Sequence, residues 1–93
     1  MSDEMDHRVA KEILGLKIEG ADTPRYSADI NAALEVVHHY DKQNYIWTMQ
    51  SETGGRWRVM LTKGPRQWHQ VVSDDGLPAA ICLAALKTVA TAL

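Results

Sequence analysis

The last seventeen residues place the strongest constraint on the fold. From Leu77 to the end the chain reads LPAAICLAALKTVATAL, in which Lys87 is the one charged side chain. Pro78 suits the first turn of a helix, and a helix that is apolar nearly all round is normally buried on more than one side. A sheet can cover only one side of it. The rest must be covered by the other helices or by a second copy of the chain.

Self-association through this last helix is therefore expected. A twofold dimer is the simplest closed arrangement. We predict that the contact between subunits involves Cys82, Leu86, Val89 and Leu93.

Residues 43–73 change to a period of two, which is typical of strands. Three short segments at 45–50, 56–61 and 67–72 are joined by SETGG and KGPR, so we predict an antiparallel meander. One face is expected to be rich in tryptophan and aliphatic side chains: Tyr45, Trp47, Met49, Trp57, Val59, Leu61, Trp68, Gln70 and Val72. The other face is expected to be mixed: Ile46, Thr48, Gln50, Arg56, Arg58, Met60, Gln67, His69 and Val71.

Two helices are predicted before the meander. Helix 3–14 has an apolar face and ends near Gly15, and helix 27–41 begins with Ser27 as its N-cap. The buried stripe of the second helix is expected at Ile30, Ala33, Leu34, Val37 and His38. The chain is therefore predicted to be a single α+β domain, residues 1–93, with the order α-α-β-β-β-α. Helices 27–41 and 77–92 are expected on the Trp face, and helix 3–14 on the opposite face or in a subunit contact.

The last five predicted elements share the topology of a double-stranded-RNA-binding domain. Such domains place lysines at the start of the closing helix, whereas this chain has Asp74 and Asp75 there. The two carboxylates would repel a phosphate backbone, so binding of double-stranded nucleic acid is not expected.

Composition argues against a membrane protein, a secreted protein and a disulfide-bonded domain. The formal net charge is −2, there is one cysteine, and no run of about 18 apolar residues occurs. The acidic start MSDEMDHR has no apolar stretch behind it, so no secretory signal is expected. An intramolecular disulfide is impossible with Cys82 alone. Together these features predict a cytoplasmic protein without a membrane span.

Charge is divided by segment, and the middle segment offers a candidate anion site. Residues 1–42 carry a balance of −4, residues 43–73 of +3 and residues 74–93 of −1. In simple meander register Arg56, Arg58 and His69 would share one sheet face, which suits an anionic ligand such as a nucleotide. The alternatives are a solvated face, or a face that meets the acidic first helix through Asp6 and Glu12.

A second candidate site lies at the start of the second predicted helix. Arg25, Tyr26 and Ser27 come together there, and free backbone N–H groups at a helix N-terminus favour anions. The simpler interpretation is that Ser27 and Asp29 serve the helix terminus while the Tyr26 ring packs against the sheet.

Catalytic and metal sites are not expected. His38 and His39 diverge by about 100° on a helix and cannot chelate one metal from one face. Cys82 sits in an Ala-rich helix, where cysteine serves as a small apolar side chain. No Walker loop, G-x-S-x-G turn or H-E-x-x-H spacing occurs. We therefore expect a protein that acts by binding, with no cofactor and no enzymatic activity.

Several segments resemble the phage ABA sandwich domain family, over roughly residues 6–92. The segments are VAKEILGL, PRYSADINAALEVVHHY and LPAAICLAALKTVA. The most specific positions are Tyr26, Ser27, Asp29, Ile30, Val36, Val37, Ala80, Ile81, Cys82, Ala84, Ala85 and Leu86. The chain departs from the family pattern at Leu16, Ala28 and Leu34, where Trp, Thr and Trp are typical.

The resemblance implies a small phage or prophage protein with a sheet between helical layers. A phage origin favours a counter-defence role. The expected partner is a host defence protein, inhibited by surface contact as anti-CRISPR proteins do. The alternative is a sponge of the anti-CBASS or anti-Thoeris type that sequesters a small anionic nucleotide signal.

Overall fold

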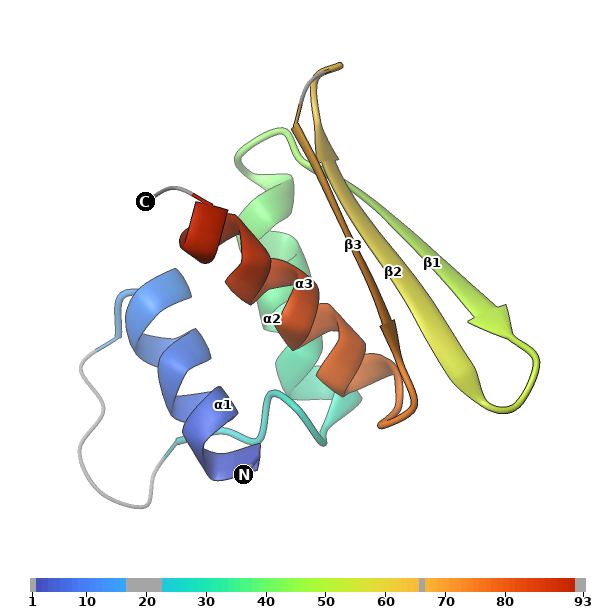
Figure 1. Cartoon of the computed structure of the whole chain (residues 1–93). Coiled ribbons are helices and arrows are strands. Elements are labelled where there is room, and N and C mark those ends of the chain that lie inside the picture. Colours follow the sequence, from blue (N-terminus) through green and yellow to red (C-terminus); the bar gives the residue numbers. More distant parts are fainter. Residues whose placement is uncertain (1, 17–22, 66, 92–93) are drawn as a thin grey trace.

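The structure is a computed structural model and describes residues 2–16, 23–65 and 67–91. It contains α1 (Ser2–Arg8), the π-helical turn η1 (Val9–Ile13) and α2 (Ile30–Asp41). The strands β1 (Ile46–Glu52), β2 (Arg56–Lys63) and β3 (Gln67–Ser73) follow, and α3 (Leu77–Thr91) closes the chain. Gly15 ends the first helical segment with φ of +67°, a conformation that glycine adopts without strain. The α+β class and the element order are thus as predicted (Figure 1).

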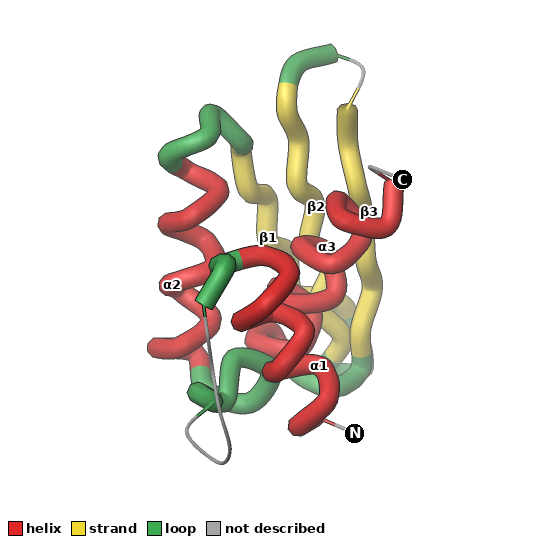
Figure 2. The backbone as a smooth tube through the Cα atoms, turned by 90° about the vertical axis from the view of Figure 1, so that its left-hand side faces the viewer, coloured by secondary structure: helices red, strands yellow, loops and turns green. Residues whose placement is uncertain are grey.

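Helix α3 is the centre of the molecule. It packs on β2 and β3 with one side, along α2 with a second and against η1 with a third (Figures 1 and 2). Ala80, Ile81, Cys82, Ala84 and Ala85 have no exposed surface. The apolar helix is therefore covered within one chain, and its lack of charge no longer requires a second copy.

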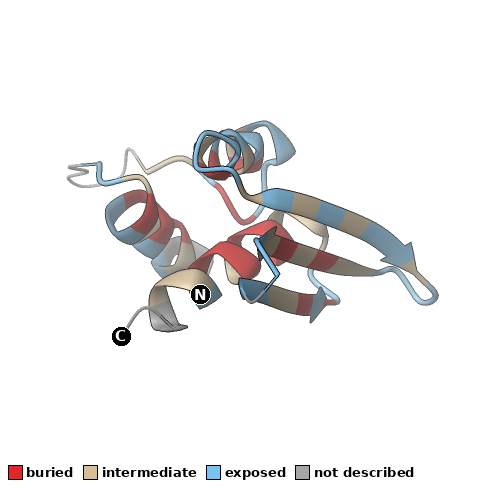
Figure 3. Cartoon of the chain, turned by 90° about the horizontal axis from the view of Figure 1, so that it is seen from above, coloured by how far each residue is buried: buried red, intermediate tan, exposed pale blue. Residues whose placement is uncertain are grey.

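The first helix lies elsewhere than predicted. Instead of covering the opposite face of the sheet, α1 and η1 lie on the side of α3 away from the sheet (Figures 1 and 3). Val9, Ala10 and Ile13 bury their side chains there. The reason is that α3 is apolar on this side as well and accepts the apolar face of η1. All described helices therefore lie on one side of the sheet.

The sheet has the order β1-β2-β3 with both pairs antiparallel. Trp47 pairs with Leu61 and Leu61 with His69, while Met49, Val59 and Val71 form the next row. These rows face α3. Trp68 and Val72, which we predicted on this face, point the other way because β3 is shifted by one residue relative to our register, and His69 and Val71 take the inner positions.

Helix α2 begins and packs differently from the prediction. Asp29, not Ser27, is its N-cap, since its carboxylate accepts the Asn31 N–H at 2.9 Å. Of the predicted stripe, Ala33 is buried and Val37 half-buried, whereas Ile30, Leu34 and His38 are exposed. Val36 and Tyr40 are buried instead. Ala33 is part of the same core cluster as the Ala-rich α3.

Tyr40 links α2 to both neighbours. Its ring packs edge-on against Tyr45 and Trp47, with centroids 5.0 and 5.8 Å away. Its hydroxyl lies 2.7 Å from Thr88 Oγ1 and donates to Ala85 O at 3.2 Å.

Replacing Tyr40 with Phe should lower the free energy of unfolding by about 1 kcal/mol, because the hydroxyl is lost while the ring contacts remain. Urea unfolding followed by circular dichroism measures the change. An unchanged midpoint would show that the hydroxyl contributes nothing to stability.

Candidate functional site

The face of the sheet that points away from α3 is the candidate site, and we call it the open face. It carries the alternate side chains of the three strands: Ile46, Thr48, Gln50, Glu52, Arg56, Arg58, Met60, Thr62, Trp68, Gln70 and Val72. None of the described helices covers it (Figure 3).

The apolar side chains of the open face are exposed. Ile46 is 67% exposed, Trp68 60% and Val72 43%, and Ile46 and Trp68 flank Thr62 in one cross-strand row. Single exposed apolar side chains are ordinary, but several on one flat face are typical of an interaction surface. The arrangement suits contact with an apolar, flat partner surface.

The charged end of the open face is internally neutralised. Arg58 Nε lies 2.7 Å from Glu52 Oε2, and Arg56 Nε lies 3.4 Å from Asp74 Oδ1. The Arg56–Asp74 pair is exposed and adds little to stability, whereas the Arg58–Glu52 pair is partly buried. They do lower the positive potential that an anionic ligand needs.

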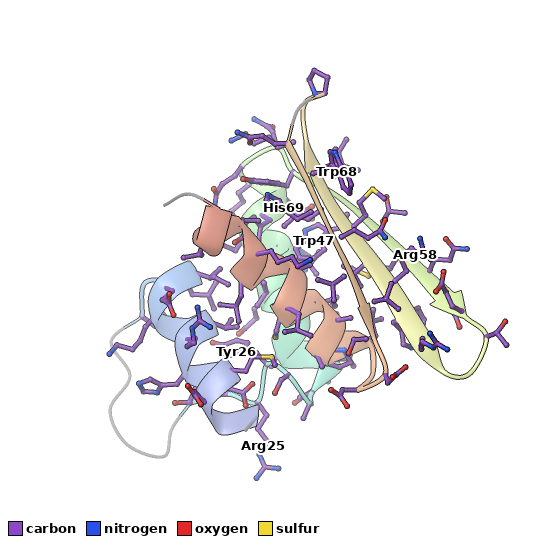
Figure 4. The ribbon with its side chains drawn as sticks, in the orientation of Figure 1. Arg25, Tyr26, Trp47, Arg58, Trp68 and His69 are labelled. Atoms are coloured by element: carbon purple, nitrogen blue, oxygen red, sulfur yellow. The ribbon has the colours of Figure 1, made fainter. Side chains whose placement is uncertain are left out.

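The predicted basic face of Arg56, Arg58 and His69 is not assembled. His69 lies opposite Leu61 on the inner face, whereas the two arginines are on the open face (Figure 4). The shift of β3 that brings Trp68 outward is the reason. Trp68, which we had placed on the buried face, takes a position on the open face opposite Thr62, four residues along β3 from Val72, the partner of Arg58.

The second candidate site, Arg25–Tyr26–Ser27, is also divided by the fold. Tyr26 is buried and Arg25 is exposed and extends away from the body of the molecule (Figure 4). The Ser27 N–H donates to the buried Asp6 carboxylate at 2.7 Å. This segment therefore ties α1 to the start of α2, and Arg25 lies far from Arg58 across the molecule.

The predicted oligomer contact lies in or near the core. Cys82 and Leu86 are buried within the single chain, and Val89 packs beside the core. Leu93 lies outside the described residues. Cys82 is thus not available to a second copy in this structure.

Burial raises the pKa of the Cys82 thiol to about 12, with a smaller contribution from the Asp6 carboxylate. We expect iodoacetamide to leave Cys82 unmodified in the native protein and to alkylate it in guanidinium chloride, as intact mass measures. Keeping the Cys82 thiol protonated in the folded protein contributes to the free energy of unfolding. Because the folded pKa exceeds the usual value of 9.0, this contribution is fully present below pH 9 and is lost as the pH rises towards 12. A Cys82→Ala variant should lose less stability over that range, and rapid native alkylation would contradict the burial.

The described part of the chain offers neither a metal site nor a membrane-spanning helix. No group of three or more His, Cys, Asp or Glu side chains gathers there in a way that suits a metal ion. None of the helices found in it is both long and apolar enough to cross a membrane.

The chain matches the phage ABA sandwich domain family over residues 7–86. No curated protein and no solved structure matches it. The match covers most of the chain, so the protein belongs to the phage ABA sandwich domain family.

Proposed function

We propose that this phage protein acts by binding, as a counter-defence inhibitor that blocks a host immune protein in the cytoplasm through its open face. The observation that carries the proposal is the exposure of Trp68 and Ile46, at 60% and 67%, on the sheet face opposite the described helices. Tryptophan is the residue type most enriched at the energetic centre of protein interfaces.

The composition of the open face supports a protein partner. Ile46 and Trp68 lie at one end and the ion pairs at the other, where Val72 lies opposite Arg58, with Thr48, Met60 and Gln70 between the two ends. Protein interfaces combine exposed apolar side chains with polar and charged ones, and the open face offers both. A nucleotide sponge needs several converging cations, and Arg56 and Arg58 are each engaged by a carboxylate.

The test is relief of immunity in living cells. The protein is expressed in a panel of bacterial strains, each with one defence system, and each strain is challenged with a phage that the system restricts. We expect plating to recover in at least one strain, and the protein to co-purify with a component of that system. Recovery in no strain would contradict the proposal.

The sponge alternative has its own readout. The protein purified from the same strain is denatured, and released small molecules are identified by mass spectrometry. We expect no cyclic nucleotide. A stoichiometric amount of one would replace the protein-binding proposal by sequestration.

A further inference from the structure

Residues of α1 and α3 line a hollow of about 540 Å³, which is within the size range of small-molecule sites. One part of its lining is apolar and comes from Met5 of α1 and from Ala79, Leu83 and Leu86 of α3. The three α3 residues follow one another at intervals of four and three, so they form a continuous apolar stripe along one side of the helix.

The Ser27 hydroxyl is the polar group that points to a ligand in this hollow. Ser27 lines the hollow and is only 7% exposed, and its Oγ has no hydrogen-bond partner among the described residues. A buried hydroxyl without a partner destabilises a folded chain, and the large majority of buried polar groups in proteins do have one. The Ser27 N–H is already used, since it donates to the buried Asp6 carboxylate at 2.7 Å. The hydroxyl therefore remains for a group inside the hollow, with a second carboxylate-bearing residue close behind it.

The charged side chains around the hollow select a cation. Glu4 and Asp75 line it, and neither forms an ion pair with a described residue. Arg8 is the only base among the described lining residues, and its Nε lies 2.7 Å from Glu12 Oε2. The Arg8 charge is thus already met by a carboxylate outside the lining, whereas those of Glu4 and Asp75 are not. A positively charged group is favoured beside these two.

The two ends of the hollow differ in character. Asp75 precedes the first residue of α3, whereas Leu86 lies more than two turns into the helix, roughly 14 Å further along at about 1.5 Å per residue. Arg8, Leu83 and Leu86 also line a neighbouring hollow of about 450 Å³, together with Lys87. The carboxylates therefore mark one end, and apolar side chains with the bases mark the other. A ligand with a single positive charge and an apolar chain matches this division.

We propose that the hollow binds a small aliphatic monoamine in its protonated form. An ammonium group has three N–H donors, which matches the three acceptors Ser27 Oγ, Glu4 and Asp75, and its hydrogen bonds to carboxylates are charge-assisted. The hydrocarbon chain lies on Leu83 and Leu86. The inference goes beyond the proposed function, because α1 and α3 lie on the helical side of the sheet, away from the open face (Figure 1).

The test is an NMR titration of the full chain with n-hexylamine at neutral pH. The methyl signals of Met5, Leu83 and Leu86 should shift and saturate, while that of Ile46 on the open face should stay unchanged. The uncharged n-hexanol and the anionic hexanoate have the same chain length, and each should bind at least tenfold more weakly. The diamine of the same length should also bind more weakly, because its second ammonium group would lie near Arg8.

Two adjacent carboxylates supply a matched pair of variants. Asp75→Asn should weaken n-hexylamine binding at least tenfold. Asp74→Asn should leave it unchanged, because Asp74 pairs with Arg56 at 3.4 Å and does not line the hollow. Both side chains are exposed, so both variants should keep the Tm of the wild type.

Ser27→Ala separates a ligand-binding hydroxyl from a structural one. The variant should bind n-hexylamine at least threefold more weakly, yet its Tm without the amine should not fall, because the hydroxyl that it removes has no partner in the described chain. A lower Tm would show that the hydroxyl is bonded within the protein and would overturn its assignment to a ligand.

The remaining outcomes decide the inference as a whole. The absence of a saturable shift, equal binding of n-hexanol, or equal losses of affinity in Asp75→Asn and Asp74→Asn would overturn it. The titration uses the purified protein without any partner, so its result does not depend on whether the chain relieves immunity.

Discussion

Replacing Trp68 with Ser should weaken binding of the proposed host immune partner at least about thirtyfold and leave the fold intact. Loss of an aromatic side chain at the centre of an interface costs about 2 kcal/mol or more, which corresponds to roughly thirtyfold in Kd. The side chain is 60% exposed and points away from α3, so its loss leaves no cavity in the core. Calorimetric titration of the purified partner measures the affinity.

Leu34→Ser is the matched control for this prediction. Leu34 is also an exposed apolar residue, at 40%, but it lies on α2. Its replacement should leave the affinity unchanged. An equal loss of affinity in the two variants, or a loss of affinity in Leu34→Ser alone, would contradict the open face as the interface and point to the helical side of the molecule.

Replacing Leu61 with Ala should lower the free energy of unfolding by about 2–5 kcal/mol, the range for removal of a buried leucine side chain. Leu61 is completely buried in the middle strand, between Trp47 and His69 on the inner face. For a chain of this size each kcal/mol lowers Tm by about 4–8 °C. Thermal unfolding followed by circular dichroism gives the shift.

Ile46→Ala provides the comparison on the other face of the same sheet. Its side chain is 67% exposed, and substitutions at such positions usually change stability by less than about 0.5 kcal/mol. A large loss in Ile46→Ala would show that something in the free protein covers the open face. A small loss in Leu61→Ala would show that the inner face is not the core.

The sequence was sufficient to predict the element order and the burial of the last helix. The near absence of charge between Leu77 and Leu93 required cover on several sides, and the fold supplies it from the sheet, α2 and η1. The choice between a second copy and the chain's own helices depended on where the first helix packs. No local pattern contains that information, because it is a contact between segments distant in sequence.

The side chains of the open face were mispredicted because the register between β2 and β3 depends on the length of the turn that joins them. Lys63 pairs with Gln67, so three residues lie between the paired positions, and odd-numbered residues of β2 meet odd-numbered residues of β3. A shift of one residue exchanges the two faces of a strand. The KGPR segment predicts a turn but not how many residues the turn contains. Without that number the sequence could not decide whether Trp68 or His69 lies on the inner face of the sheet.

The buried face of α2 could not be predicted from the sequence pattern alone either. Ile30 and Leu34 have helical spacing, and so do Ala33, Val36 and Tyr40, so the pattern alone permits two faces. The second set is buried in the core, where the Tyr40 hydroxyl donates a hydrogen bond to Ala85 O of α3.

The proposal that the open face is the binding surface is tested most directly by NMR of the complex with the host immune protein that we propose as the partner. Labelled Ile, Met and Val methyl groups and Trp indole N–H groups report on both sides of the molecule. We predict that the signals of Ile46, Met60, Trp68 and Val72 shift or broaden, while that of Ile30, exposed on α2, stays unchanged. Perturbation of Ile30 with unchanged signals from Trp68 and Ile46 would contradict the open face as the interface.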